Sequence, residues 1–112
     1  MEIRFERHDH RHLCNSRAAL AGRWGAGRAA LLEQRLQELD AVDCLADLDT
    51  LPHVEVRDDG TRLHVGVDGG LDLLLRAEDG RNPSGDLAWT EVTVVTLVDI
   101  VDGPVMEDRS DR

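Results

Sequence analysis

Hydrophobic residues recur at two spacings along this chain of 112 residues, every three to four residues in the first half and every second residue afterwards. Residues 1–5 alternate apolar and charged side chains, which predicts a short strand. Residues 11–21 predict a helix, which a group of glycines interrupts. A second helix is predicted over residues 27–41, because its apolar residues recur at steps of three and four. These residues are Ala29, Leu32, Leu36 and Leu39.

A short helix over Cys44–Leu48 and then Pro52 end the helical half. The alternation that follows predicts four strands, since apolar side chains at every second position share one face of a sheet. They cover residues 54–57, 63–68, 71–75 and 90–101. Asp58 to Thr61 predict a hairpin turn, because Gly60 can adopt a positive φ, and Gly69-Gly70 predict a second turn. The segment 90–101 is almost entirely β-branched or apolar, which favours the most buried, central strand.

The predicted order is therefore β-α-α-β-β-β-β. Helices that precede a run of hairpin strands are typical of the α+β class, so we expect an N-terminal helical hairpin packed on one face of a mainly antiparallel sheet. A chain of this length has room for one core, and we predict a single domain over residues 1–106. The charged residues 107–112 are predicted to be a disordered tail.

Charge is distributed unevenly along the chain, whose formal net charge is -10. Residues 1–35 carry seven arginines against four acidic residues, a net charge of +3, whereas residues 36–112 carry six against 19, a net charge of -13. A surface that binds nucleic acid needs clustered positive charge, so any such site in the second part must be local. The charged N-terminus and the lack of a long apolar segment predict a cytoplasmic protein with no membrane partner.

Short motifs in the helical half resemble those of the HigB-like killer toxins of the RelE/ParE superfamily. They are LCN at Leu13–Asn15, the break at Trp24-Gly25, RLQEL at Arg35–Leu39 and LADLDTLP at Leu45–Pro52. The order of predicted elements is also similar. The resemblance implies a RelE-like fold and the toxin component of a bacterial type II toxin–antitoxin module. Such a toxin is a ribosome-associated mRNA endoribonuclease that a cognate antitoxin, here expected to be of the helix-turn-helix type, neutralises.

Cleavage of RNA by its own 2′-hydroxyl needs a proton acceptor, a proton donor and positive charge beside the phosphate. The candidate catalytic residues are His64, Arg62 and Arg57, which lie on the hairpin around Gly60. The candidate RNA-binding residues are Arg76 and His53. No cofactor is expected for this chemistry. The alternative interpretation is that these side chains form the solvated face of an amphipathic hairpin, since they alternate with buried positions.

Three departures from the family pattern lead to a second hypothesis. HigB-like relatives typically end the last strand with Asp-Tyr-His, where this chain has Asp102, Gly103 and Pro104. Asp72 stands where the family has an arginine, and the chain contains no tyrosine. These departures favour a non-catalytic RelE-fold protein-interaction module that has lost ribonuclease activity. A small structural or regulatory module outside toxin–antitoxin biology is a third possibility.

A cluster of histidines near the N-terminus raises the question of a metal site. His8 and His12 lie four residues apart, which suits a pair of ligands on a helix, and His10 lies between them. No further ligands follow at a typical zinc spacing, so a solvated helix start is the favoured interpretation and no metal is predicted.

Overall fold

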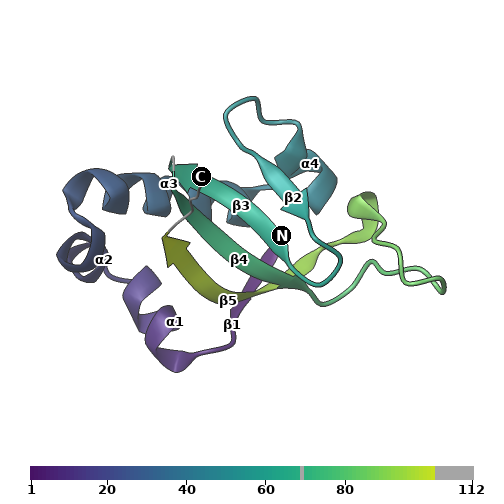
Figure 1. Ribbon diagram of the computed structural model, residues 1–112, viewed down its shortest axis with the longest axis horizontal. Helices are drawn as coiled ribbons and strands as arrows, with labels where there is room; N and C mark the ends of the chain where they lie inside the picture. The colour runs from purple at the N-terminus through teal and green to yellow at the C-terminus, as the bar shows by residue number, and fades with distance from the viewer. Residues whose placement is uncertain (69, 103–112) are drawn as a thin grey trace, which may run out of the picture.

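The computed structural model describes residues 1–68 and 70–102 and has the predicted α+β class. Four helices follow the first strand, and the remaining strands come after them (Figure 1). The helices are α1 (His8–Cys14), α2 (Arg17–Trp24), α3 (Ala26–Ala41) and α4 (Leu45–Asp49). The strands are β1 (Glu2–Phe5), β2 (Val56–Asp58), β3 (Leu63–Asp68), β4 (Leu71–Ala77) and β5 (Val94–Asp102). A short 3₁₀ turn, Trp89–Glu91, precedes β5.

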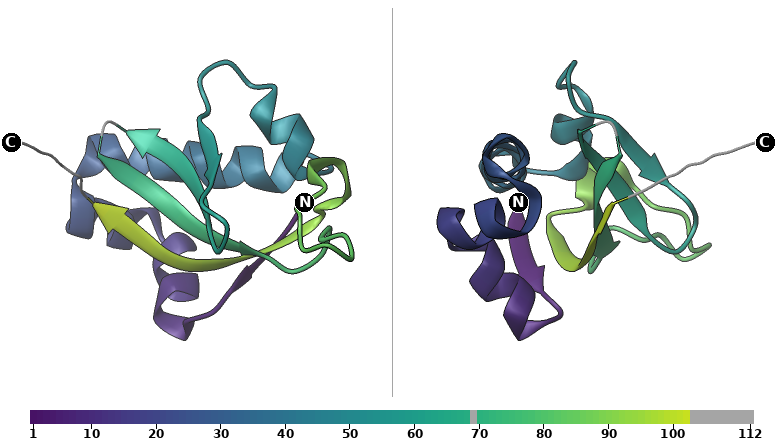
Figure 2. Two further views of the ribbon diagram at one scale, coloured as in Figure 1. Left: turned by 45° about the vertical axis from the view of Figure 1, so that its right-hand side comes forward. Right: turned by 60° about the vertical axis from the view of Figure 1, so that its left-hand side comes forward.

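The five strands form one mixed sheet in the order β1-β5-β4-β3-β2. β1 runs parallel to β5, and every other neighbouring pair is antiparallel, so the sheet is mainly antiparallel as predicted. Helices α2 and α3 lie together on one side of this sheet (Figure 2). We call the opposite face of the sheet, the one that faces away from α2 and α3, the open face. None of the helices in the described part of the chain is long and apolar enough to cross a lipid bilayer.

A leucine-rich core fills the space between the helices and the sheet. Every second residue of β4 from Leu71 to Leu75 is buried, as the alternation in the sequence predicts. The helices contribute apolar residues from α2, α3 and α4 to the same core cluster. The largest fully buried side chains are Leu20, Leu32, Leu39, Leu45, Leu48, Leu63, Leu71, Leu73, Leu75 and Leu97.

The predicted first helix over residues 11–21 is wrong, because the structure has two helices there. α1 ends at Cys14 and α2 begins at Arg17. Ser16 causes the break, since its hydroxyl accepts a hydrogen bond from the backbone N–H of Ala19 at 3.1 Å and caps α2. The helical part therefore contains four helices rather than a simple hairpin, although α3 begins and ends close to its predicted limits.

The predicted central strand over residues 90–101 also needs correction. Its first residues form the 3₁₀ turn, and β5 begins at Val94, where Asp79 accepts hydrogen bonds from the N–H groups of Thr93 and Val94. β4 is the middle strand of the sheet. β5 is second from the edge, because β1 pairs with its other side and forms the edge. The consecutive residues 95–97 are nevertheless all buried, as the composition of the segment predicts.

The turn at Asp58 to Thr61 is confirmed, with Gly60 at a φ of 96°. The second predicted turn includes Gly69, which lies outside the described residues. Residues 103–112 also lie outside them, and with them the predicted end of the domain and the predicted tail.

Candidate functional site on the open face of the sheet

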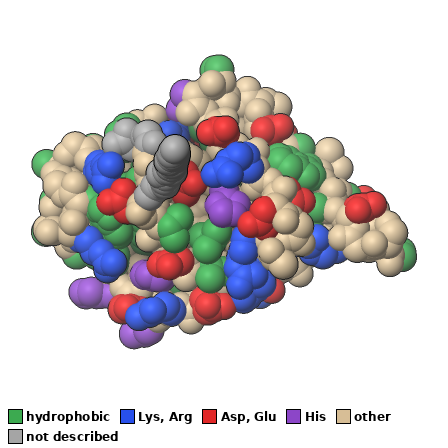
Figure 3. All heavy atoms as spheres, viewed as in Figure 1, with side chains coloured by type: hydrophobic (Ala, Val, Ile, Leu, Met, Phe, Trp, Pro, Cys, Tyr) green, Lys and Arg blue, Asp and Glu red, His purple; other side chains and the backbone are tan. Residues whose placement is uncertain are grey.

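Four of the five predicted site residues point to the open face. In the strand register Arg57 of β2 lies opposite His64 of β3, which lies opposite Leu74 of β4. Arg62 and Arg76 share the same face by alternation along their strands. Figure 3, which views this face, shows basic, acidic and apolar side chains interspersed over it. The open face is therefore chemically mixed rather than uniformly basic.

Arg57 forms an ion pair with Asp72, and their nitrogen and oxygen atoms lie 3.0 Å apart. The two residues lie on β2 and β4, with β3 between them. Gly66 is the β3 residue opposite Asp72 and has no side chain, which leaves the arginine a path across β3. The charge of Asp72 therefore neutralises one of the predicted catalytic groups.

His64 has an acidic partner as well. Its Nε2 atom lies 2.8 Å from a carboxylate oxygen of Asp59 in the hairpin turn. The same carboxylate accepts hydrogen bonds from the backbone N–H groups of Thr61 and Arg62 at 2.9 and 2.7 Å. The bond from His64, together with these backbone bonds, lowers the pKa of Asp59 far below its ordinary range. His64 is thus held beside an ionised carboxylate.

Arg76 is bound by two carboxylates. Its guanidinium lies 2.6 Å from Glu6 and 3.1 Å from Glu78, and both bonds raise the pKa of Arg76. Glu78 in turn accepts a hydrogen bond from the hydroxyl of Thr96, and this bond together with Arg76 lowers the pKa of Glu78. The cation is therefore part of a closed polar network that links β4 to β5 and to the residue after β1.

Arg62 differs from these three residues. Its guanidinium donates to the carbonyl oxygen of Thr61 at 3.4 Å. Among the side chains that the structure describes, no carboxylate lies within ion-pair distance of it. Arg62 is thus the predicted catalytic residue that keeps an uncompensated charge in the described structure.

His53 lies in a different cluster, on the helical side of the sheet. Its Nε2 atom is 2.5 Å from a carboxylate oxygen of Glu38 on α3, and Glu38 also accepts a hydrogen bond from Arg35. Burial raises the pKa of Glu38, but the bonds from His53 and Arg35 outweigh it, and the pKa lies below its ordinary value. The structure therefore does not bring His53 together with the other predicted residues.

Sequence reasoning missed Arg35, whose side chain is only 5% exposed. Its Nε atom donates to the carbonyl oxygen of Gly66 at 2.8 Å, at the edge of β3 beyond the end of β2. Leu36, predicted to be buried, is only half buried. A signal was present, because Arg35 lies three residues after Leu32 and four before Leu39, on the buried stripe itself.

The N-terminal histidines do not converge. His8 and His12 are exposed, whereas His10 is buried with its Nε2 atom 3.5 Å from Asp99. In the described parts of the chain, no three histidine, cysteine, aspartate or glutamate side chains are placed to hold a metal ion. Cys14 is a free thiol, and burial raises its pKa to about 11, which disfavours a nucleophilic role.

No protein-family model, curated protein or solved structure matches the chain. The likeness to HigB-like toxins therefore depends on the motifs between residues 13 and 52 and on the order of the elements.

Proposed function

We propose that this chain is a non-catalytic protein-interaction module of the RelE-like type, and that its open face binds a protein partner. The partner we favour is a cognate antitoxin of the helix-turn-helix type. The strand β1 that precedes the helices, the paired helices on one side of the sheet and the motifs of residues 13–52 support the RelE-like assignment.

The observation that carries the proposal is the pairing of cations with carboxylates on the open face. Arg57 is paired with Asp72, His64 with Asp59, and Arg76 with Glu6 and Glu78. An RNA phosphate at any of these positions would have to displace a carboxylate and would lie close to its negative charge. Such a surface is poorly suited to a polyanion.

The centre of the same face suits a protein partner. Leu74 of β4, opposite Asp99 of β5, is half buried there, and Val101 is half buried on the same face near the end of β5. An apolar centre inside a rim of charged residues is typical of protein interfaces. The charged pairs of the rim would then contribute more to specificity for the partner than to the affinity of binding.

An mRNA endoribonuclease is the second candidate function. Arg62 with its uncompensated charge, and His64 held by Asp59, are the observations that favour it. In that case His64 would transfer a proton and Arg62 would contact the phosphate.

One experiment separates the two functions. The chain is expressed in a sensitive bacterium with and without the product of the adjacent gene, while growth and mRNA cleavage are followed. The proposal predicts normal growth, intact mRNA and co-purification of the adjacent product. Growth arrest with cleaved mRNA, abolished by His64→Ala, would establish the endoribonuclease instead. Arrest produced only by Asp72→Arg would show that the fold retains the RNA site and that its chemistry alone has decayed.

The binding face is tested in the same system. Leu74→Glu places a charge at the apolar centre and should abolish co-purification, provided that the variant keeps the thermal stability of the wild type. Arg17→Glu is the matched control, because Arg17 lies on α2 in an exposed ion pair with Glu33 and should leave binding unchanged. Loss of binding in both variants, or in neither, would place the interface elsewhere.

A further inference from the structure

β1 is an edge strand whose outer edge has no partner among the described residues. Within the described residues it pairs only with β5: the N–H of Glu2 donates to the carbonyl oxygen of Thr93, just before β5, and that of Glu6 to Leu97 of β5. Because backbone groups alternate along a parallel strand, the N–H and C=O groups of Ile3 and Phe5 point away from β5. No hydrogen bond from another described element reaches them.

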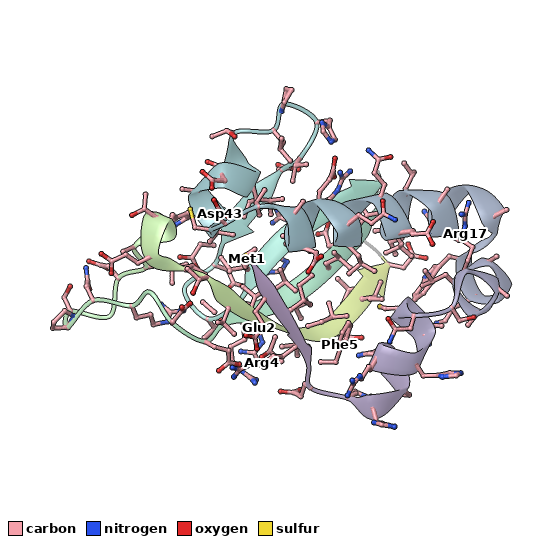
Figure 4. All side chains as sticks on the ribbon, turned by 180° about the vertical axis from the view of Figure 1, so that it is seen from behind. Met1, Glu2, Arg4, Phe5, Arg17 and Asp43 are labelled. Carbon is pink, nitrogen blue, oxygen red and sulfur yellow. The ribbon has the colours of Figure 1, made fainter. Side chains whose placement is uncertain are left out.

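The side chains of β1 divide between the two faces of the sheet. Glu2 and Arg4 are exposed and form an ion pair with each other at 2.6 Å. Met1, Ile3 and Phe5 are half buried and pack against the core. Figure 4 shows β1 from behind, with Glu2 and Arg4 extending from the side of the strand away from α3.

We propose that a second copy of this chain pairs with the outer edge of β1, antiparallel to it, with the two-fold axis at Ile3. The sequence of residues 1–5 is apolar, acidic, apolar, basic and apolar, so it is complementary to its own reverse. In this register the Ile3 residues of the two copies exchange both backbone hydrogen bonds. Glu2 of each copy lies opposite Arg4 of the other, which makes two cross-strand ion pairs on one face.

Charge and the length of β1 together select this register over its neighbours. An axis at Arg4 would place Arg4 opposite Arg4 and Glu2 opposite Glu6, and both of these pairs are repulsive. An axis at Phe5 would require residues 6 and 7, which lie beyond the end of β1. An axis at Glu2 would leave only residues 1–3 to pair. The register centred on Ile3 pairs residues 2–4 of both copies, sets Phe5 opposite Met1 at the start of the chain and opposes unlike charges.

The pairing would join the two sheets into one of ten strands, with both open faces on the same side. Pairing along one short strand buries little surface, so the dimer should be weak and its population should rise with protein concentration. The proposal is independent of the proposed function, because the edge of β1 and the centre of the open face are different surfaces.

Sedimentation velocity over a wide range of protein concentration tests the pairing. The wild type should shift from monomer to dimer as concentration rises. Glu2→Arg and Arg4→Glu should each weaken dimerisation by about tenfold, since each places like charges opposite one another at two positions. The double variant, Glu2→Arg with Arg4→Glu, should restore the dimer, because the unlike pairs re-form with their signs exchanged.

Arg17→Glu is the control, since it changes the net charge as much as Arg4→Glu but lies on α2. It should dimerise like the wild type. Amide hydrogen exchange adds a local measurement: the N–H groups of Ile3 and Phe5 should be slower to exchange in the wild type than in the single variants.

Two outcomes would overturn the proposal. One is a wild type that stays monomeric at every concentration. The other is a dimer that both single variants preserve, which would place the contact on another surface. Neither outcome affects co-purification of an adjacent gene product, so failure of the dimer and failure of the proposed function are distinguishable.

Discussion

The Asp59 carboxylate, in the hairpin turn between β2 and β3, makes bonds that exist only in the folded chain. His64 and the backbone N–H groups of Thr61 and Arg62 all bond to its carboxylate, which lowers its pKa in the folded chain. In the unfolded chain the same carboxyl titrates at about pH 4. A lowered pKa in the folded state contributes stability above that pH, and this contribution is lost as the pH falls below it.

Asp59→Asn should therefore reduce the pH dependence of folding in acid. The free energy of unfolding of the wild type should fall as the pH drops below about 4, and that of the variant should fall less. At neutral pH the variant should be less stable than the wild type, because the amide cannot form a charged bond with His64. Urea unfolding at a series of pH values measures both effects.

Asp49→Asn is the control for this comparison. Asp49 is exposed at the end of α4, and its carboxylate makes no hydrogen bond within the described structure. Its substitution should leave the acid limb of the stability curve as steep as in the wild type. If the curves for Asp59→Asn and the wild type had the same slope, Asp59 would not be the group that couples folding to pH.

At the scale of elements, the sequence predicted what depends on local periodicity. Alternation identified β1, β3 and β4, and the Asp-Gly turn identified the hairpin between β2 and β3. It did not predict the break between α1 and α2, because the Ser16 cap lies within a segment whose apolar spacing continues through it. The parallel pairing of β1 with β5 brings together residues that are about 90 positions apart in the sequence. No local pattern predicts such a contact.

The contact between α3 and the sheet edge depends strongly on Arg35. The register of β2 with β3 ends at Val65, beyond which the N–H of Gly66 donates to the carbonyl oxygen of Glu55, and the Arg35 guanidinium bonds to the carbonyl oxygen of Gly66. It also bonds to Glu38 on its own helix. When a buried arginine is removed, the buried acceptors of its hydrogen bonds lose a donor that water cannot easily replace.

Arg35→Met should lower the free energy of unfolding by about 2–4 kcal/mol, since methionine fills much of the volume but leaves the Gly66 carbonyl without its side-chain donor and removes one of the donors of Glu38. Urea unfolding at neutral pH measures the loss. Arg17→Met removes an arginine of an exposed pair and should cost less than about 1 kcal/mol. Equal losses in the two variants would mean that burial gives Arg35 no special role.

At the scale of the molecule, the candidate site shows why sequence reasoning stopped short of function. The sequence placed Arg62 and His64 on one face, because that requires only alternation along a strand. It could not show that Arg57 and Arg76 are paired with carboxylates from distant parts of the chain. Glu6 lies 70 residues from Arg76, and Asp72 reaches Arg57 across an intervening strand.

The net charge of -10 leads to a prediction for the whole molecule. Its ion pairs are mostly exposed, and each exposed pair contributes little to stability. Repulsion among the excess carboxylates acts over longer distances and is screened at a Debye length of about 10 Å in 0.1 M salt. The melting temperature should therefore rise as sodium chloride increases from about 0.01 M to 0.3 M, because screening relieves the repulsion more than it weakens the pairs.

A variant with fewer charges distinguishes this cause from a general effect of salt. Asp40 and Asp49 are exposed near the C-terminal ends of α3 and α4, where the helix dipole already disfavours negative charge. Asp40→Asn with Asp49→Asn should raise the melting temperature in low salt and reduce its dependence on salt. A melting temperature that falls with salt in the wild type would instead mean that the surface ion pairs, and not the excess charge, dominate the electrostatics of this fold.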